Sequence, residues 1–228
     1  MILLAAALAA ASPAEPADAA PAADTVAPAA NKAPPAEPPT RSAAVERVTA
    51  WVAGTGDNHG HPYIIVDKPA ARVYLFDKTG KPLREAPVLI GRAIGDEATP
   101  AIGRKSLSEI GPAEKTTPAG RYLARFGRAV GHPVLWVDYA TSVALHTIPP
   151  ANKEHRRARM LSPQIDDNRI TFGCINVPAA FYKAVGPRFR KDGGYVYVLP
   201  DVKPLETVFP MLAVYRPPAA ADLAATPR

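Results

Sequence analysis

Short apolar runs separated by turn-forming residues recur through most of this chain and constrain its fold more than any other feature. The first two, at 63–67 and 72–76, flank the segment Lys-Pro-Ala-Ala and predict a β-hairpin. A third apolar run spans 86–91, and further strands are expected at 121–126, 133–138, 142–146 and 195–199. One helix is predicted, beginning at Pro178 and ending at Gly186. Short strands with one or two short helices predict a mainly β fold, a compact sandwich or barrel.

Both ends of the chain differ in composition from its middle. Residues 1–11 are apolar and end in small residues, as a secretory signal does, although no Lys or Arg precedes them. Residues 12–50 are rich in Ala and Pro, with too few large apolar side chains to repay ordering, and predict a disordered tether. One folded domain is expected over 51–216, followed by a flexible tail at 217–228. This organisation predicts export to the periplasm or cell envelope.

Charge separates these segments and bears on the class of partner. Residues 1–50 carry a net charge of −2 and residues 51–228 a net charge of +8. A moderately basic exported domain suits an anionic partner such as a cell-wall polymer or a membrane surface, or the charge simply solvates the surface. The bases are dispersed and form no array with aromatic residues, so we expect no nucleic-acid binding.

Cys174 is the only cysteine and lies in the sequence Thr-Phe-Gly-Cys-Ile-Asn. A lone thiol forms no intrachain disulfide, and in an exported protein it is at risk of oxidation, which favours a chemical role. Free cysteine also packs as a small buried hydrophobe, so the residue alone leaves both interpretations open.

A histidine 28 residues upstream and a neighbouring glycine favour the chemical role. Alternation over 143–146 places Val143 and Leu145 on one strand face and His146 on the other. An imidazole can generate the thiolate of a nearby cysteine, and the carbonyl of Thr147 is positioned to fix its tautomer. Gly173 has no Cβ, so a substrate carbonyl can approach, and the N–H groups of residues 173 and 174 are candidate oxyanion donors.

These residues resemble the L,D-transpeptidase catalytic domain family, whose signature is a histidine followed by Ser/Thr-His-Gly-Cys, an apolar residue and Arg or Asn. The matching residues are His146, Thr171, Gly173, Cys174, Ile175 and Asn176. The segment 116–122 is similar to the family's Thr-Pro-x-Gly-x-aromatic turn, and the resemblance covers about 62–200. It implies a cysteine enzyme that crosslinks peptidoglycan stem peptides through a thioester on Cys174, with His146 as base and acid and without a cofactor.

Two departures from the family pattern concern the site. Phe172 stands where the family usually has histidine, and the gap between His146 and Thr171 is longer than usual. The extra residues at 152–170 include the run His-Arg-Arg-Ala-Arg at 155–159, either a lid or carboxylate-binding segment or a solvated basic helix face.

The remaining candidates are residues near the cysteine that could contact substrate and a polar segment near the first strand. Thr171, Phe172, Asn176 and Arg169 are expected to contact substrate, with Arg169 alternatively bracing the loop. The segment 57–61 offers two imidazoles and a carboxylate, but a polar loop is favoured there and no metal site is expected.

The sequence leaves several functions open. If water accepted the acyl group from Cys174, the protein would be an L,D-carboxypeptidase, and if a free D-amino acid accepted it, the terminal D-amino acid of the stem peptide would be exchanged. A protein that had lost turnover would be a peptidoglycan-binding module. A thiol redox role lacks the second cysteine that would resolve a mixed disulfide. The sequence does not fix the oligomeric state.

Overall fold

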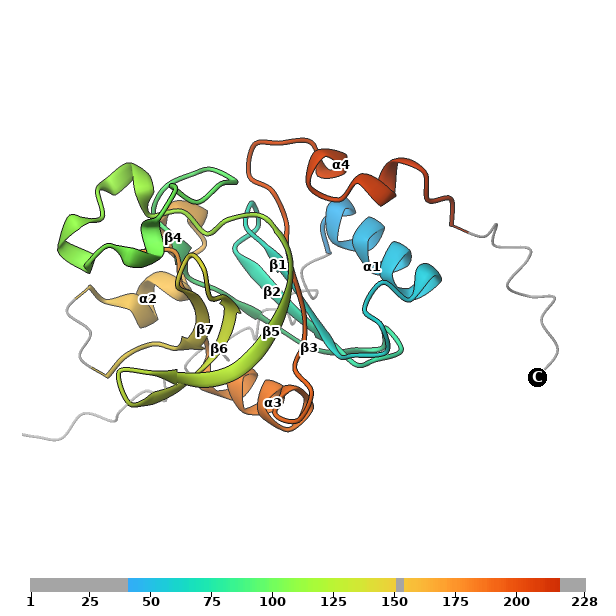
Figure 1. The fold of residues 1–228 in the computed structure, drawn as a ribbon, viewed down its shortest axis with the longest axis horizontal. Helices are drawn as coiled ribbons and strands as arrows, with labels where there is room; N and C mark the ends of the chain where they lie inside the picture. Colours follow the sequence, from blue (N-terminus) through green and yellow to red (C-terminus); the bar gives the residue numbers. More distant parts are fainter. Residues whose placement is uncertain (1–40, 151–153, 218–228) are drawn as a thin grey trace, which may run out of the picture. The chain divides into compact units, whose positions relative to one another are not determined.

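A mixed, mostly antiparallel sheet dominates the computed structural model, which describes residues 41–150 and 154–217 (Figure 1). In spatial order its strands are β3 (Pro82–Pro87), β2 (Arg72–Phe76), β1 (Tyr63–Asp67), β10 (Gly194–Val198), β5 (Gly120–Ala129), β6 (His132–Asp138), β7 (Val143–Thr147) and β9 (Ile175–Val177). The pairs β1–β10 and β7–β9 are parallel. A second sheet pairs β4 (Ile90–Gly91) with β8 (Arg169–Thr171). The predicted mainly β fold and its opening hairpin are confirmed.

Helices are few and mostly short. The α-helices are α1 (Ala43–Thr55), α2 (Arg156–Met160), α3 (Ala179–Phe189) and α4 (Leu205–Val208). Single 3-10 turns occur at η1 (Ile102–Arg104), η2 (Leu107–Glu109), η3 (Pro112–Glu114), η4 (Ile165–Asn168) and η5 (Pro210–Ala213). Within the described ranges, no helix has the length and apolar character needed to cross a membrane.

The two ends of the larger sheet come together, which makes the sheet barrel-like. Leu89, just after β3, exchanges two backbone hydrogen bonds with Asn176 of β9, at 3.0 and 2.9 Å. Alternate residues of the strands point inward and form the main core with Phe181, Val185 and Phe189 of α3. Strand β9, which follows Cys174, is thereby fixed on both sides.

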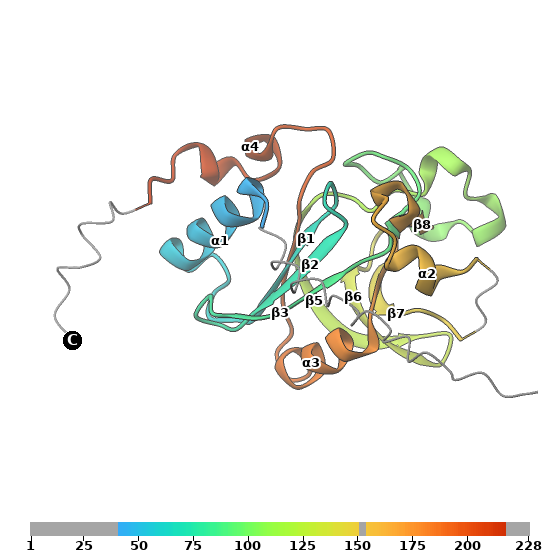
Figure 2. The same ribbon diagram turned by 180° about the vertical axis from the view of Figure 1, so that it is seen from behind.

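A second core lies on the other face of β1, β2 and β10. Val48 and Trp51 of α1 pack there with Tyr63 and Phe209, and Figure 2 shows α1 and α4 on this side. Because both faces of β1 are covered, all five of its residues are buried.

Helix α1 corrects the boundary expected for the tether at residue 50. It begins at Ala43, where the Ser42 side chain caps the Val45 N–H at 3.2 Å, and its buried residues Val45, Val48, Trp51 and Val52 recur at helical spacing. The Ala-rich composition hid this apolar stripe. The signal-like segment 1–11, the rest of the tether to residue 40 and the tail from 218 lie outside the described residues.

Helix α3 starts after Pro178 as predicted, but it passes Gly186 and ends at Phe189. Pro187 lies inside it, where the absent N–H removes one hydrogen bond. The Arg190 N–H still bonds to the Gly186 carbonyl at 3.1 Å, and Phe189 is fully buried. Core packing of Phe189 therefore outweighs the local stop signal.

Candidate active site

The loop that carries Cys174 joins β8 to β9 and is held by the Thr171 hydroxyl. This hydroxyl accepts from the Gly173 N–H at 3.1 Å and donates to the Cys174 carbonyl at 2.6 Å. Thr171 is 1 % exposed, so its side chain braces the loop from within. The Gly173 N–H, expected as an oxyanion donor, is already engaged by this hydroxyl.

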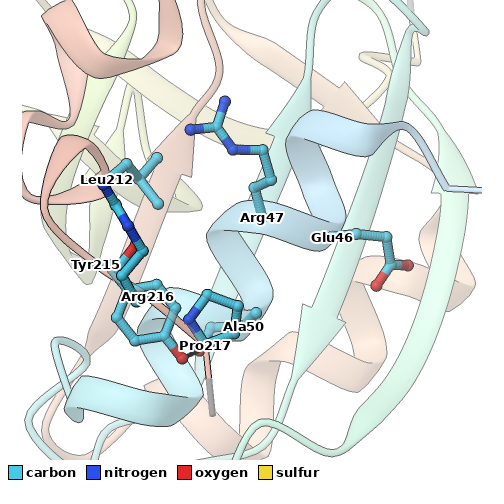
Figure 3. A pocket seen from close by; sticks show the side chains of 7 residues that line it. All are labelled: Glu46, Arg47, Ala50, Leu212, Tyr215, Arg216 and Pro217. Atoms are coloured by element: carbon cyan, nitrogen blue, oxygen red, sulfur yellow. Dashed lines mark hydrogen bonds between the residues drawn. The ribbon is translucent and has the colours of Figure 1, made fainter. Parts of the chain in front are cut away.

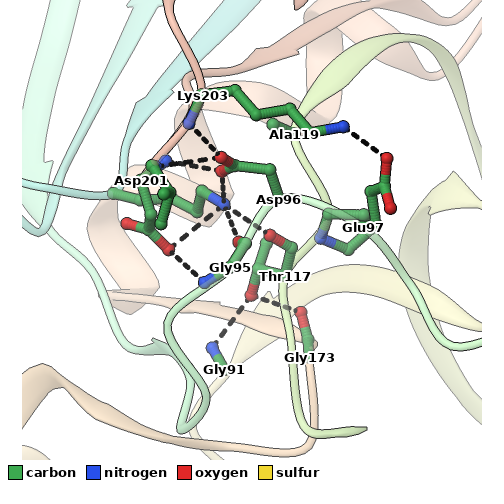
Figure 4. Close-up of polar contacts among 12 residues, drawn as sticks. Gly91, Gly95, Asp96, Glu97, Thr117, Ala119, Gly173, Asp201 and Lys203 are labelled. Atoms are coloured by element: carbon green, nitrogen blue, oxygen red, sulfur yellow. Dashed lines mark hydrogen bonds and ion pairs between the residues drawn. The ribbon is translucent and has the colours of Figure 1, made fainter.

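Gly173 occupies a position that only glycine fits. Its φ is +125°, and a Cβ there would lie 2.7 Å from the carbonyl oxygen of Thr116. Its own carbonyl accepts from the Thr117 hydroxyl at 2.8 Å, and the same hydroxyl accepts from the Gly91 N–H at 2.9 Å (Figure 4). The segment 116–117 therefore fixes the loop from the side opposite to Thr171.

A buried ion network lies behind Thr117. Lys68, which is 0 % exposed, donates to the Thr117 carbonyl at 2.9 Å, the Gly95 carbonyl at 2.6 Å and Asp96 at 3.0 Å (Figure 4). Its ammonium is also 3.3 Å from Asp201. Sequence reasoning placed Lys68 only in a hairpin turn, and an isolated turn lysine carries no signal of this burial.

Arg169, expected to contact substrate or brace the loop, belongs to the same network. Its guanidinium binds both carboxylate oxygens of Asp201, at 2.6 and 3.3 Å, and its side chain is 10 % exposed. The structure therefore gives Arg169 a bracing position at the start of β8.

His146 lies on β7, opposite Asn176 of β9 in the parallel register. Val143 and Leu145 point into the main core, as the alternation predicted, and His146 points to the other face. Its Nδ1 is 2.7 Å from the Thr147 carbonyl, the contact expected to fix the tautomer. Burial lowers the pKa of His146, the charge of Arg156 lowers it further, and the Thr147 carbonyl opposes this in part. The imidazole is therefore neutral at neutral pH.

Cys174 lies in the loop just before β9 and contacts Ser142 and Ala144, in the segment that continues along β7 to His146. The thiol donates to the Ser142 carbonyl at 3.8 Å. Burial raises the pKa of the Cys174 thiol, while a hydrogen bond from Ala144 and the charge of Arg156 oppose this without reversing it. These shifts favour a neutral thiol and a neutral imidazole, an arrangement suited to general-base activation.

Asn176 links the histidine to the segment inserted at 152–170. Its side-chain nitrogen is 3.3 Å from Nε2 of His146, and its side-chain oxygen accepts from Nη1 of Arg156 at 2.9 Å. Asn176 is 0 % exposed and therefore faces the histidine rather than open solvent. Arg156 is the site residue that sequence reasoning did not single out, because it was one base in a run of four basic residues at 155–159.

Phe172, at the position usual for histidine, is covered by Lys115. The Lys115 ammonium lies 3.8 Å from the centroid of the phenyl ring, within cation–π range. This contact brings Lys115, just before the 116–122 turn, to the nucleophile loop.

The residues of the 57–61 segment make contacts away from the Cys174 loop. Asp57 binds Arg121 and the Tyr197 hydroxyl, and His59 and His61 pack against Tyr195. In residues 41–150 and 154–217, no three His, Cys, Asp or Glu side chains gather as a metal site would require.

A pocket of about 290 Å³ lies between α1 and the C-terminal segment (Figure 3). It is lined by Glu46, Arg47, Ala50, Leu212, Tyr215, Arg216 and Pro217. None of these residues belongs to the Cys174 site.

The comparison with protein families identifies the domain that contains this site. The sequence model of the YkuD family, the L,D-transpeptidase catalytic domain, matches residues 61–190. Because the match covers more than half of the chain, this protein belongs to the L,D-transpeptidase catalytic domain family. No curated protein matches the sequence.

Three solved structures resemble the chain at low identity. An L,D-transpeptidase mutant from Enterococcus faecium is 18 % identical with a TM-score of 0.35, covering 61 % of this chain and 50 % of its own. Bd1075 from Bdellovibrio bacteriovorus is 15 % identical with a TM-score of 0.38, and the match covers 63 % of this chain and 49 % of Bd1075. An L,D-transpeptidase from Xylanimonas cellulosilytica is 16 % identical with a TM-score of 0.37, and the match covers 61 % of this chain and 60 % of that structure. The chain thus spans about half of the first two structures.

Proposed function

We propose that this protein is a cysteine acyltransferase that acts on peptidoglycan stem peptides outside the cytoplasm. The observation that supports the proposal is the pairing of β7, which carries His146, with β9, which directly follows Cys174, together with the contact of the thiol with the Ser142 carbonyl just before β7. Membership of the L,D-transpeptidase catalytic domain family supports the substrate class and, because peptidoglycan is extracytoplasmic, the location.

Acylation begins with proton transfer from Cys174 Sγ to Nε2 of His146. The sulfur attacks the carbonyl carbon between the third residue of a stem peptide and its terminal D-amino acid, which gives a tetrahedral oxyanion. The C–N bond then breaks, the departing amine takes the proton from His146, and a thioester remains on Cys174.

The second half-reaction releases the acyl group. An amine from a neighbouring stem peptide attacks the thioester, His146 accepts its proton, and Cys174 recovers a proton as it leaves. These steps use side chains of the chain itself and require no metal or organic cofactor.

The oxyanion would be stabilised from the backbone of the nucleophile loop. We assign this role to the Cys174 N–H, because the Gly173 N–H donates to Thr171. Using Gly173 as well would require that hydrogen bond to break during the reaction.

Mass spectrometry of the intact protein after incubation with a disaccharide-tetrapeptide tests the proposal. We expect an acyl adduct in the wild-type protein and none in Cys174→Ala or His146→Ala. His132→Ala is the matched control, since this histidine is exposed on the β5–β6 hairpin. Adduct in His132→Ala should equal that of the wild type.

The products decide among the related activities. A 3→3 crosslinked dimer indicates transpeptidation, a tripeptide indicates carboxypeptidase activity, and a tetrapeptide with a supplied D-amino acid indicates exchange. Binding of the muropeptide without adduct or product would overturn the enzymatic proposal in favour of a binding module, in which Phe172 replaces the family's histidine.

A further inference from the structure

Arg156 reaches the histidine through one intermediate residue. It is the first residue of α2, in the segment that lengthens the gap between His146 and Thr171. Its guanidinium donates to the Asn176 side-chain oxygen at 2.9 Å, and the Asn176 nitrogen lies 3.3 Å from Nε2 of His146. The contacts thus run from Arg156 through Asn176 to His146.

The chemistry of these groups fixes the direction of each hydrogen bond. A guanidinium has donors only, so it must face the oxygen of the Asn176 amide. The amide NH₂, which also only donates, then faces His146, and Nε2 must be the acceptor. Nδ1 consequently carries the ring proton and donates it to the Thr147 carbonyl at 2.7 Å.

We propose that Arg156 is a positioning residue that, through Asn176, holds His146 in the tautomer that carries its proton on Nδ1 and leaves Nε2 unprotonated. The proposal rests on the proposed function, because it concerns the same base. It assigns to the inserted segment a role in orienting the catalytic histidine.

The charge of Arg156 also affects the pKa values of both His146 and Cys174. After burial, which lowers the pKa of His146 and raises that of Cys174, Arg156 lowers both. Its side chain is only 15 % exposed, so solvent screens it weakly. Asn176, which contacts the histidine, is neutral, and Glu154 pairs with Arg156 at 2.7 Å.

The pH dependence of Cys174 alkylation by iodoacetamide tests the proposal without a peptidoglycan substrate. Because Cys174 is the only cysteine, the reaction reports one site. We expect Arg156→Met to slow alkylation at pH 7 by roughly three- to tenfold, as expected from removing one nearby charge. Arg156→Lys keeps the charge and a donor and should recover most of the rate.

Arg157→Met is the matched control, because Arg157 is the next residue of α2 and is exposed. It makes the same chemical change and should leave the alkylation profile unchanged. An Arg156→Met profile equal to that of Arg157→Met would overturn the proposal.

Long-range ¹H–¹⁵N NMR of the His146 ring provides a second measurement on the wild-type protein. We expect the Nδ1–H tautomer, and a mixture of tautomers in Arg156→Met. A wild-type ring protonated on Nε2 would overturn the proposal even if the Arg156 variant failed to fold.

The two proposals fail in different ways. If Cys174 forms an acyl adduct but Arg156 substitution changes neither alkylation nor the tautomer, the enzymatic proposal stands and the positioning role of Arg156 is rejected. A response in alkylation and tautomer without any adduct would keep the positioning role and reject transpeptidation.

Discussion

At the scale of single residues, burial sets the protonation of the site. It raises the pKa of Cys174 and lowers the pKa of His146, so both groups are neutral before reaction. A thiolate–imidazolium pair would need the opposite shifts. The shift at Cys174 favours the thiol over the thiolate, which is the reactive form.

Gly173→Ala tests the loop at this scale. The φ of +125° and the 2.7 Å approach to Thr116 strain any side chain there. We expect the free energy of unfolding to fall by about 1–3 kcal/mol and acylation to slow by roughly 100-fold. Chemical denaturation and adduct kinetics measure the two effects.

Gly186→Ala is the control for this substitution. Gly186 lies within α3, where an added Cβ meets only the end of the Arg190 side chain at 3.8 Å. It should leave acylation unchanged and stability unchanged or raised. Acylation that survives in Gly173→Ala would show that the loop tolerates a side chain.

At the scale of elements, β7 and β9 position the site because each is paired or bridged on both sides. β9 has three residues, yet it pairs with β7 and is bridged to Leu89. The preceding loop is fixed by two threonine hydroxyls, Thr171 from within and Thr117 from the neighbouring segment. The nucleophile is therefore held by strand pairing and two threonine side chains rather than by a long element.

Thr117→Val tests the second of these contacts. The substitution keeps the shape of the side chain but leaves the buried Gly91 N–H without its acceptor and frees the Gly173 carbonyl. We expect a loss of about 1–3 kcal/mol in the free energy of unfolding together with slower acylation.

Thr49→Val on α1 makes the same chemical change at a hydroxyl that has no hydrogen-bond partner among the described residues. It should be neutral or stabilising and leave acylation unchanged. Equal effects of the two substitutions in denaturation and adduct assays would contradict the role given to Thr117.

At the scale of the whole domain, a buried ion network joins segments far apart in the sequence. Lys68, Asp96, Arg169 and Asp201 come from four separate segments. Burial opposes the ionisation of Asp96, but backbone hydrogen bonds from Lys203, Asp201 and Val202, with Lys68, lower the pKa of Asp96 to about 2. The network reaches Gly173 through Thr117 and so couples the fold to the site.

Lys68→Met removes the cation between two buried carboxylates. We expect the free energy of unfolding to fall by about 3–5 kcal/mol. Lys105→Met is the control, because its pair with Glu114 lies at the surface, and it should cost less than about 1 kcal/mol. Similar losses for both variants in urea denaturation would contradict the importance of burial.

The acid dependence of stability follows from the same network. The folded pKa of Asp96, about 2, lies below its usual 3.8. Its contribution is therefore complete above about pH 4 and is lost as the pH falls towards 2.

The sequence alone was informative wherever a local pattern carried the signal. Alternation predicted the inward Val143 and Leu145 and the outward His146, and the short apolar runs predicted β1, β2, β5, β6, β7 and β10 but not β8 or β9. Local signals failed where packing outweighed them. Gly186 did not end α3 because Phe189 is buried in the core, and an Ala-rich stretch hid the apolar stripe of α1.

The sequence by itself determined most of the longer strands, the family motif and the pair Cys174 and His146 as candidates. Only the tertiary structure decided that Lys68 and Arg169 belong to one buried ion network and that Arg156 contacts Asn176. The physical reason is that a charged side chain carries no local mark of its partner. Its environment is created when segments distant in the chain pack together and exclude water.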